Sequence, residues 1–233
     1  MHIRHAITAF IASGALLQAA SASVFFTFQD PSTPLEFHYT AGDGVNMGTI
    51  TYDPAAVVSL KVDGTQDGFG VFSVDTRLVM DFTVGTASGV GGVFSAPTSG
   101  TFRFEVIGGA YDGTDILSGT MQEGALVSFV TAGALISTSS NGTLTLEAGQ
   151  MLLDAMATVN LTELVPQFDA SFSLADISPG VFGLNQFGYM TSFNANAAFV
   201  GNAVAIPSPG SAALGAIAIM LCMPQRRRPA SIA

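Results

Sequence analysis

Alternation of apolar and polar residues runs through much of the chain and predicts β-strands. A period of two residues places one set of side chains on a buried face and the other set in solvent, as in a half-buried strand. Helical spacing of apolar residues is rare by comparison. The alternation is clearest in residues 58–63, 77–84, 101–106 and 168–174.

Glycine-containing pairs fall between these runs and predict tight turns, because glycine tolerates the positive φ angles that such turns need. Residues 135–137 and 143–147 flank Asn141-Gly142, which predicts a hairpin. Residues 85–100 are rich in Gly and Ser and predict a long loop or a division between two halves of the sheet. The other turn pairs lie at residues 42–44, 63–64, 67–68 and 112–113.

Residues 148–158 are the one candidate for a helix, and their pattern fits a strand equally well. About a dozen short strands with frequent turns predict an all-β fold. We predict an antiparallel β-sandwich of jelly-roll-like type. An N-terminal signal helix and a C-terminal hydrophobic sorting helix are expected to flank it.

The first residues have the layout of a secretory signal peptide. Arg4 precedes an apolar run over residues 6–17, and Ala20-Ser21-Ala22 forms a small-x-small cleavage site. We expect residues 1–22 to be removed by signal peptidase, which reads Ala20 and Ala22 and cuts before Ser23. The alternative is an amphipathic first helix of the mature fold.

The last residues also resemble a targeting segment. Pro207-Ser208-Pro209 precedes an apolar run over residues 212–223, and Arg226-Arg227-Arg228 follows it. A helix over that run would be about 18 Å long, shorter than the hydrocarbon core of about 30 Å. Transient insertion with the arginines on the cytoplasmic side is therefore expected. The alternative is a buried C-terminal core helix.

This order of proline motif, hydrophobic helix and arginines resembles the PEP-CTERM sorting signal of bacteria over residues 206–228. The family motif is Pro-Glu-Pro, whereas this chain has Ser208 in the middle, and Pro224 separates the apolar run from the arginines. The resemblance implies processing by a membrane exosortase and an association with exopolysaccharide and biofilm. The sorting residues that it implies are Pro207, Ser208, Pro209, Arg226, Arg227 and Arg228, within a segment of residues 207–233.

Charge and cysteine usage limit the function classes. Residues 23–206 hold all 17 acidic residues of the chain but only three basic ones, which gives a net charge of −14. Binding of nucleic acid or anionic lipid through a basic patch is thereby excluded. The one cysteine, Cys222, lies in the tail, so residues 23–206 form no internal disulfide.

The residues that carry common enzyme chemistry are scarce. His38 is the one histidine of residues 23–206, and its place on the polar face of an alternating run indicates a surface strand residue. No second histidine or cysteine is present there for the usual zinc sites or cysteine dyads, and no Gly-x-Ser-x-Gly elbow occurs. A pair of carboxylates could serve a glycoside hydrolase, although the chain has no tryptophan for a sugar platform.

Calcium is the one cofactor that the sequence suggests. Residues 63–67 and 112–115 each place two carboxylates on a short Asp-Gly loop, and Ca²⁺ prefers such oxygen ligands. Neither loop follows the EF-hand pattern, and ordinary turns are the alternative. The candidate ligands are Asp63, Asp67, Asp112 and Asp115.

These features together predict an exported bacterial protein of the cell surface or extracellular matrix. Its residues 23–206 would form one secreted acidic domain with a structural or adhesive, non-enzymatic role, in contact with polysaccharide or neighbouring surface proteins. Signal peptidase and an exosortase-like enzyme would process it, after transient insertion of the tail into the membrane. The alternative is a secreted carbohydrate-binding module or a carboxylate-pair glycoside hydrolase on a β-sandwich.

Overall fold

The computed structural model describes residues 22–29, 34–90, 92–129, 133–180 and 182–207. These residues form one large antiparallel sheet with a single short α-helix, α2 (Gln150–Ala157), and two 3₁₀ turns, η1 (Thr65–Asp67) and η2 (Gly109–Tyr111). The strands are β1 (Ala22–Gln29), β2 (Phe37–Thr40), β3 (Gly48–Tyr52), β4 (Val58–Gly64), β5 (Gly70–Val84), β6 (Ser88–Val90), β7 (Val93–Val106), β8 (Asp115–Phe129), β9 (Gly133–Ala148), β10 (Leu161–Ser178) and β11 (Phe193–Pro207).

The four clearest predicted strands are confirmed, because they lie within β4, β5, β7 and β10. Burial follows the predicted alternation. Along β4, for example, Val58, Leu60 and Val62 are buried while Ser59 and Lys61 are exposed. The all-β, antiparallel class read from this period is therefore correct.

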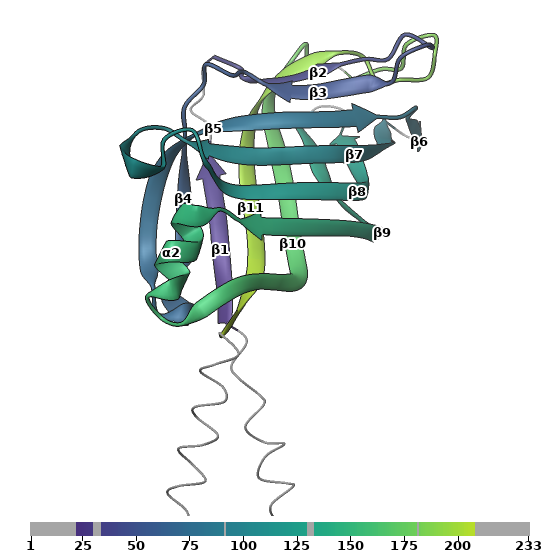
Figure 1. Cartoon of the computed structure of the whole chain (residues 1–233). Helices are drawn as coiled ribbons and strands as arrows, with labels where there is room; N and C mark the ends of the chain where they lie inside the picture. The colour runs from purple at the N-terminus through teal and green to yellow at the C-terminus, as the bar shows by residue number, and fades with distance from the viewer. Residues whose placement is uncertain (1–21, 30–33, 91, 130–132, 181, 208–233) are drawn as a thin grey trace, which may run out of the picture.

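The strands pair in a closed circuit. From β7 to β11 each strand pairs with the next one in the chain, and β11 then pairs with β1, β1 with β4, β4 with β5 and β5 with β7. The short strands β2 and β3 link β11 to β5. In Figure 1, β5, β7, β8 and β9 cross the molecule in one layer, and β1, β10 and β11 run steeply across them.

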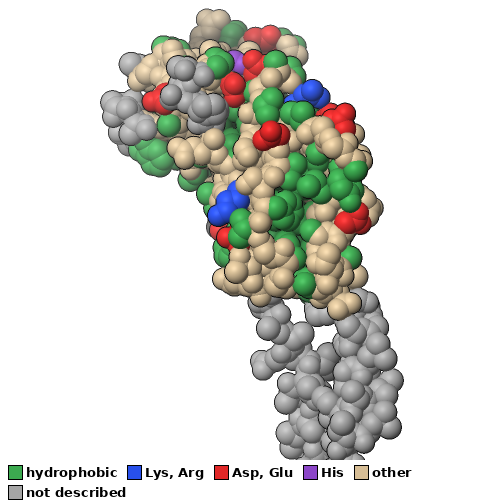
Figure 2. Space-filling model, turned by 90° about the vertical axis from the view of Figure 1, so that its left-hand side faces the viewer, with side chains coloured by type: hydrophobic (Ala, Val, Ile, Leu, Met, Phe, Trp, Pro, Cys, Tyr) green, Lys and Arg blue, Asp and Glu red, His purple; other side chains and the backbone are tan. Residues whose placement is uncertain are grey.

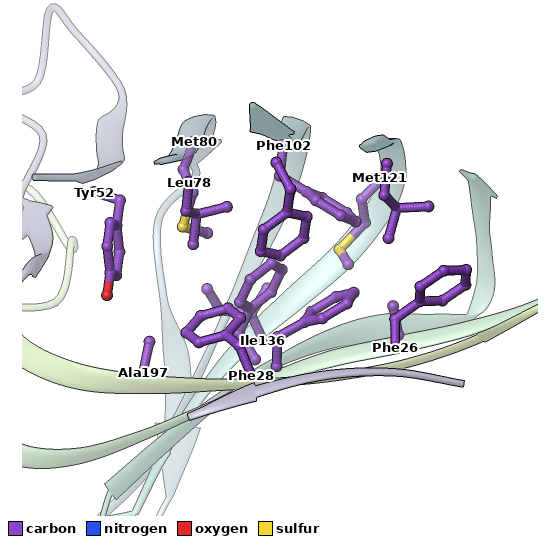
Figure 3. Packing of buried hydrophobic residues seen from close by; sticks show 14 of the residues in the cluster. Phe26, Phe28, Tyr52, Leu78, Met80, Phe102, Met121, Ile136 and Ala197 are labelled. Atoms are coloured by element: carbon purple, nitrogen blue, oxygen red, sulfur yellow. The ribbon is translucent and has the colours of Figure 1, made fainter. Parts of the chain in front are cut away.

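Aromatic side chains fill the space between these two layers. Phe199 of β11 lies 5.4 Å from Phe102 and 5.2 Å from Phe104, both on β7, measured between ring centroids. It also contacts Phe172 of β10 at 4.9 Å and Phe28 of β1 at 6.2 Å. Figure 3 shows Phe102 and Met121 pointing from one layer toward Phe26 and Phe28 on the other. Aromatic rings bury much apolar area, so this cluster contributes to holding the two layers together.

The glycine-rich residues 85–100 are largely strand, and the prediction of a long loop there was wrong. β6 and the start of β7 form a tight hairpin in which Ser88 pairs with Ser95. Gly89 belongs in it because an added Cβ would collide with the carbonyl oxygen of Val93. Here glycine allows two backbones to approach closely within a sheet, which composition alone does not reveal.

The predicted hairpin at Asn141-Gly142 was also wrong, because both residues lie inside β9. The segments on either side pair with the same strand: Thr138 is opposite Gly124, and Thr143 is opposite Gln122. The four residues between them face a single residue of β8, so the extra length forms a bulge and no reversal occurs.

Residues 148–158 contain a helix, which settles the choice between helix and strand. Leu152 and Met156 are fully buried and lie four residues apart, on one face of α2. The helix follows β9 directly and lies beside β8, β9 and β10 at one end of the sheet.

The two ends of the described fold lie side by side. Ala22, the first residue of β1, pairs with Ala205, near the end of β11, and Ser23 pairs with Val204. β1 therefore begins, and β11 ends, at the same extremity of the molecule, far from β2 and β3 (Figure 1). The predicted signal helix and sorting helix lie outside the described residues. Within the part of the chain that is described, no helix is long and apolar enough to cross a membrane.

We expect Phe199→Ala to lower the free energy of unfolding by about 3–5 kcal/mol, because it leaves a cavity among four other rings. Phe25→Ala on β1 is the matched control, since that ring is already 37% exposed. It should cost less than half as much. Urea unfolding of both variants measures the difference, and equal losses would contradict a core centred on Phe199.

Candidate functional site

A wide bulge opens the sheet between β3 and β5. β3 and β4 lie end to end along one edge of β5, with Ile50 opposite Phe82 and Val58 opposite Thr76. Seven residues, 51–57, therefore face the five residues 77–81 of β5. None of these seven residues pairs with β5: Thr51 and Tyr52 pair with β2, and residues 53–57 form the turn that leads into β4.

The bulge leaves an open pocket of about 520 Å³. Its rim carries polar side chains from β2, β3 and the bulge, and its wall is the apolar segment of β5. The polar side chains on the rim are those of His38, Thr51 and Asp53. Along the β5 wall the side chains of Leu78 and Met80 point into the core, so Val79 alone offers a partly exposed apolar side chain there.

Hydrogen bonds hold the surroundings of this pocket in place. The Nδ1 atom of His38 lies 2.8 Å from Oδ1 of Asn194 on β11. Because that amide oxygen only accepts hydrogen bonds, Nδ1 is the donor in this contact. The Tyr52 hydroxyl donates to the buried Glu36 carboxylate at 2.9 Å.

Arg77 closes the bulge from the other side. Its Nε donates to the Pro54 carbonyl at 2.8 Å, and its Nη1 lies 3.0 Å from the Glu105 carboxylate on β7. Of the residues that line the pocket, Asp53 is the one carboxylate. The lining thus combines a histidine, a carboxylate and the partly exposed side chain of Val79.

The first predicted calcium loop contains two carboxylates in contrasting states. Oδ1 of Asp63 accepts hydrogen bonds from the Thr65 amide at 3.1 Å and the Thr65 hydroxyl at 2.7 Å, which lowers the Asp63 pKa. Asp67 has both carboxylate oxygens buried without a hydrogen-bond partner. Burial raises the pKa of Asp67, because the charged form is poorly solvated there.

The carboxylates of the second predicted calcium loop interact with neighbouring protein groups. Oδ1 of Asp112 accepts the Gly108 amide at 2.6 Å, and Oδ1 of Asp115 lies 4.0 Å from Nε of Arg103. Across the described residues, no three His, Cys, Asp or Glu side chains form a group that could hold a metal ion. Calcium binding at Asp63, Asp67, Asp112 and Asp115 remains a prediction.

The predicted processing residues fall at the margin of the structure. Ala22 opens β1 and Pro207 ends β11, where it pairs with Leu161 of β10. The others lie outside the described residues: Ala20, Ser208, Pro209, Arg226, Arg227 and Arg228.

Sequence reasoning missed the loops at the opposite end of the molecule, residues 42–47 and 183–190. Apolar side chains there are solvent-exposed, with Val45 at 91% and Phe187 at 46%. The available signal was the absence of charge, since residues 177–206 contain no charged side chain. No protein-family model, curated protein or solved structure matches this chain.

We expect Asp67→Asn to raise stability at pH 7 by about 1 kcal/mol, since it removes a buried charge without partners. The raised pKa of the folded state means that wild-type stability falls as pH rises from about 4, the unfolded value, through the folded value. The gain of the variant should therefore vanish near pH 4. Thermal melts from about pH 4 to pH 8 in a chelator measure it.

Asp63→Asn is the control of opposite sign, because Asp63 has a lowered pKa and loses part of its bonding to Thr65. It should destabilise the protein at pH 7. Calcium bound at this loop would instead raise the wild-type melting temperature on calcium addition and leave Asp67→Asn unchanged. A loss of stability in Asp67→Asn under chelation would contradict the account of its charge.

Proposed function

We propose that residues 23–206 are the displayed domain of an exported bacterial protein of the cell surface or extracellular matrix. Its role is structural or adhesive, and its ends are processed by signal peptidase and an exosortase-like enzyme. The pairing of β1 with β11 is the observation that carries this proposal, because it brings the two predicted targeting segments out of the domain side by side.

This geometry suits attachment at one end. Neighbouring strands lie about 4.8 Å apart, so a signal segment before Ala22 and a tail after Pro207 would reach the same patch of membrane. The arginines at both ends favour the cytoplasmic side. The domain would then stand on its β1/β11 end and present β2, β3 and their loops outward (Figure 1).

The surface charge of the domain is consistent with display in solution, and it offers no basic patch for nucleic acid or anionic lipid. The three basic residues of the domain each lie within 4.0 Å of a carboxylate: Lys61, Arg77 and Arg103. On the face in Figure 2, acidic side chains are dispersed among polar and hydrophobic ones, and positive charge is sparse. Such an acidic surface favours solubility outside the cell and association with cations.

The scaffold also fits this role. Two layers that face each other across the Phe199 cluster support the β-sandwich class. A jelly-roll-like topology remains the finer prediction. Strands β7 to β11, which pair in chain order, form a meander within the sheet. Sandwiches serve many unrelated functions, so the fold alone does not choose among them.

A carbohydrate-binding module is the second candidate, and the bulge pocket is the observation that favours it. Its polar rim could bond to sugar hydroxyls, and Val79 of β5 could contact the apolar face of a ring. Incubation with a panel of polysaccharides separates the alternatives. Saturable retention without product supports a module, product release supports a hydrolase, and neither result leaves the structural role.

We expect protein recovered from the cell envelope and medium of its native host to have lost residues 1–22 and to end near Pro207. Intact-mass measurement of each fraction tests this, because each cut predicts a defined mass. A protein that retains Arg226, Arg227 and Arg228 would contradict sorting by tail cleavage and indicate a simple tail-anchored protein.

A further inference from the structure

The predicted signal-cleavage site lies inside a strand of the folded domain. Signal peptidase is expected to cut the bond between Ala22 and Ser23, and both residues belong to β1. In the antiparallel pairing with β11, Ala22 is opposite Ala205 and Ser23 is opposite Val204. The pairing continues along β1 to Gln29 without a shift of register. In the folded domain the bond to be cut is therefore part of a regular ladder.

Within the described residues, β11 is the one strand that pairs with β1 at this bond. β4, the other neighbour of β1, pairs with residues 25–27 and not with residues 22–24. The side chains that follow the bond are held in the core, since Val24 and Phe26 are each 0% exposed. Whether the bond is covered is therefore decided by whether β11 is in place.

This arrangement conflicts with the way in which a protease binds its substrate. The substrate lies extended on both sides of the bond that is cut, and its main chain pairs with the enzyme. In the folded domain, residues 22–24 already pair with β11, and Val24 is buried. The enzyme could reach the bond only after β1 had separated from β11. Openings of a paired core strand are rare, and cleavage that depends on them is slowed in proportion.

The order of the strands in the chain leaves the bond open for a limited time. β1 is the first strand and β11 is the last, so nearly the whole domain lies between them. A chain that is exported from its N-terminus has β1 across the membrane long before β11 arrives. The bond is then uncovered during export and becomes covered when β11 pairs.

We propose that closure of β11 onto β1 seals the signal-cleavage site, so that signal peptidase acts efficiently only before the domain has folded. The proposal rests on the proposed function, which supplies the signal segment and its enzyme, and it adds the order of events. Cleavage is hydrolysis: water breaks the peptide bond and leaves a carboxylate on Ala22 and an ammonium group on Ser23. A molecule that folds uncut keeps residues 1–22 and, in the proposed display, its N-terminal attachment to the membrane.

The test uses the purified full chain in detergent micelles with a bacterial signal peptidase. In one arm the chain is refolded before the enzyme is added, and in the other it is diluted from urea into micelles that already contain the enzyme. A peptide of residues 1–29, which lacks β11, gives the rate for an uncovered site. We expect the refolded chain to be cut at least about tenfold more slowly than the peptide. The chain diluted from urea should be cut to a greater extent than the refolded one, and mass spectrometry locates the cut.

Two substitutions on β11 separate the effect of strand pairing from that of added charge. Ala203 is 1% exposed and lies opposite Val24, so Ala203→Asp brings a carboxylate into the core beside the cut. Val200 is 54% exposed, so Val200→Asp places the same charge on the same strand in solvent. Refolded Ala203→Asp should be cut at least about fivefold faster than refolded wild type, and Val200→Asp should be cut like wild type. If Ala203→Asp does not fold, the comparison of wild type with the peptide decides alone.

Equal rates for the refolded chain and the peptide, with both cut before Ser23, would overturn the sealing and leave the proposed function intact. A peptide that stays uncut would show that residues 1–22 are not a signal for this enzyme, which would contradict the proposed function and the sealing together. Slow cutting that is unchanged in a folded but destabilised Ala203→Asp would assign the protection to the micelle and would also overturn the role of β11.

Discussion

The pairing of β1 with both β4 and β11 is the constraint on which the rest of the structure depends. β1 is the strand that joins the end of the chain to its first half, through Ala22 opposite Ala205 and Phe26 opposite Val62. Without it, β11 would pair only with β10 and the short β2, and the rings of Phe28 and Phe199 would lose their contact. Because the paired residues of β1 and β11 are more than 150 positions apart in the sequence, the fold closes only once the last strand is available.

The same pairing ties architecture to proposed role. It brings both ends of the domain to one extremity, and the meander from β7 to β11 extends the scaffold away from it. The loops of residues 42–47 and 183–190, with their exposed apolar side chains, lie at the far extremity. In the proposed display role, a domain of this shape would act as a spacer between the membrane and the loops at its far end.

Strands with a regular alternation of apolar and polar residues could be predicted from the sequence. Features that depend on how many residues of one strand oppose those of a distant strand could not. Alternation located β4, β5, β7 and β10 because burial of one face imposes the period on the residues themselves. Asn141-Gly142 was misread as a hairpin turn. Whether such a pair reverses the chain or lies in a bulge depends on the pairing with β8, where one residue opposes four of β9. The glycine-rich segment around Gly89 was misread as a loop, because glycine is favoured both in loops and where two strands approach closely. The helix over residues 150–157 was ambiguous, since eight residues are too few to separate two periods.

The candidate sites show the same limit. The bulge pocket exists because residues 51–57 are two longer than the segment of β5 that they face, and no local pattern reveals a count that involves two distant strands. The carboxylates of the Asp-Gly loops could be found by type, but their states are set by surroundings: Asp63 is bonded to Thr65, whereas the oxygens of Asp67 are buried without a partner. The exposed loop of residues 183–190 is different, because its signal is a lack of charge over residues 177–206. In so acidic a chain, the uncharged segment is the more informative one, since solubility alone would favour a charge there.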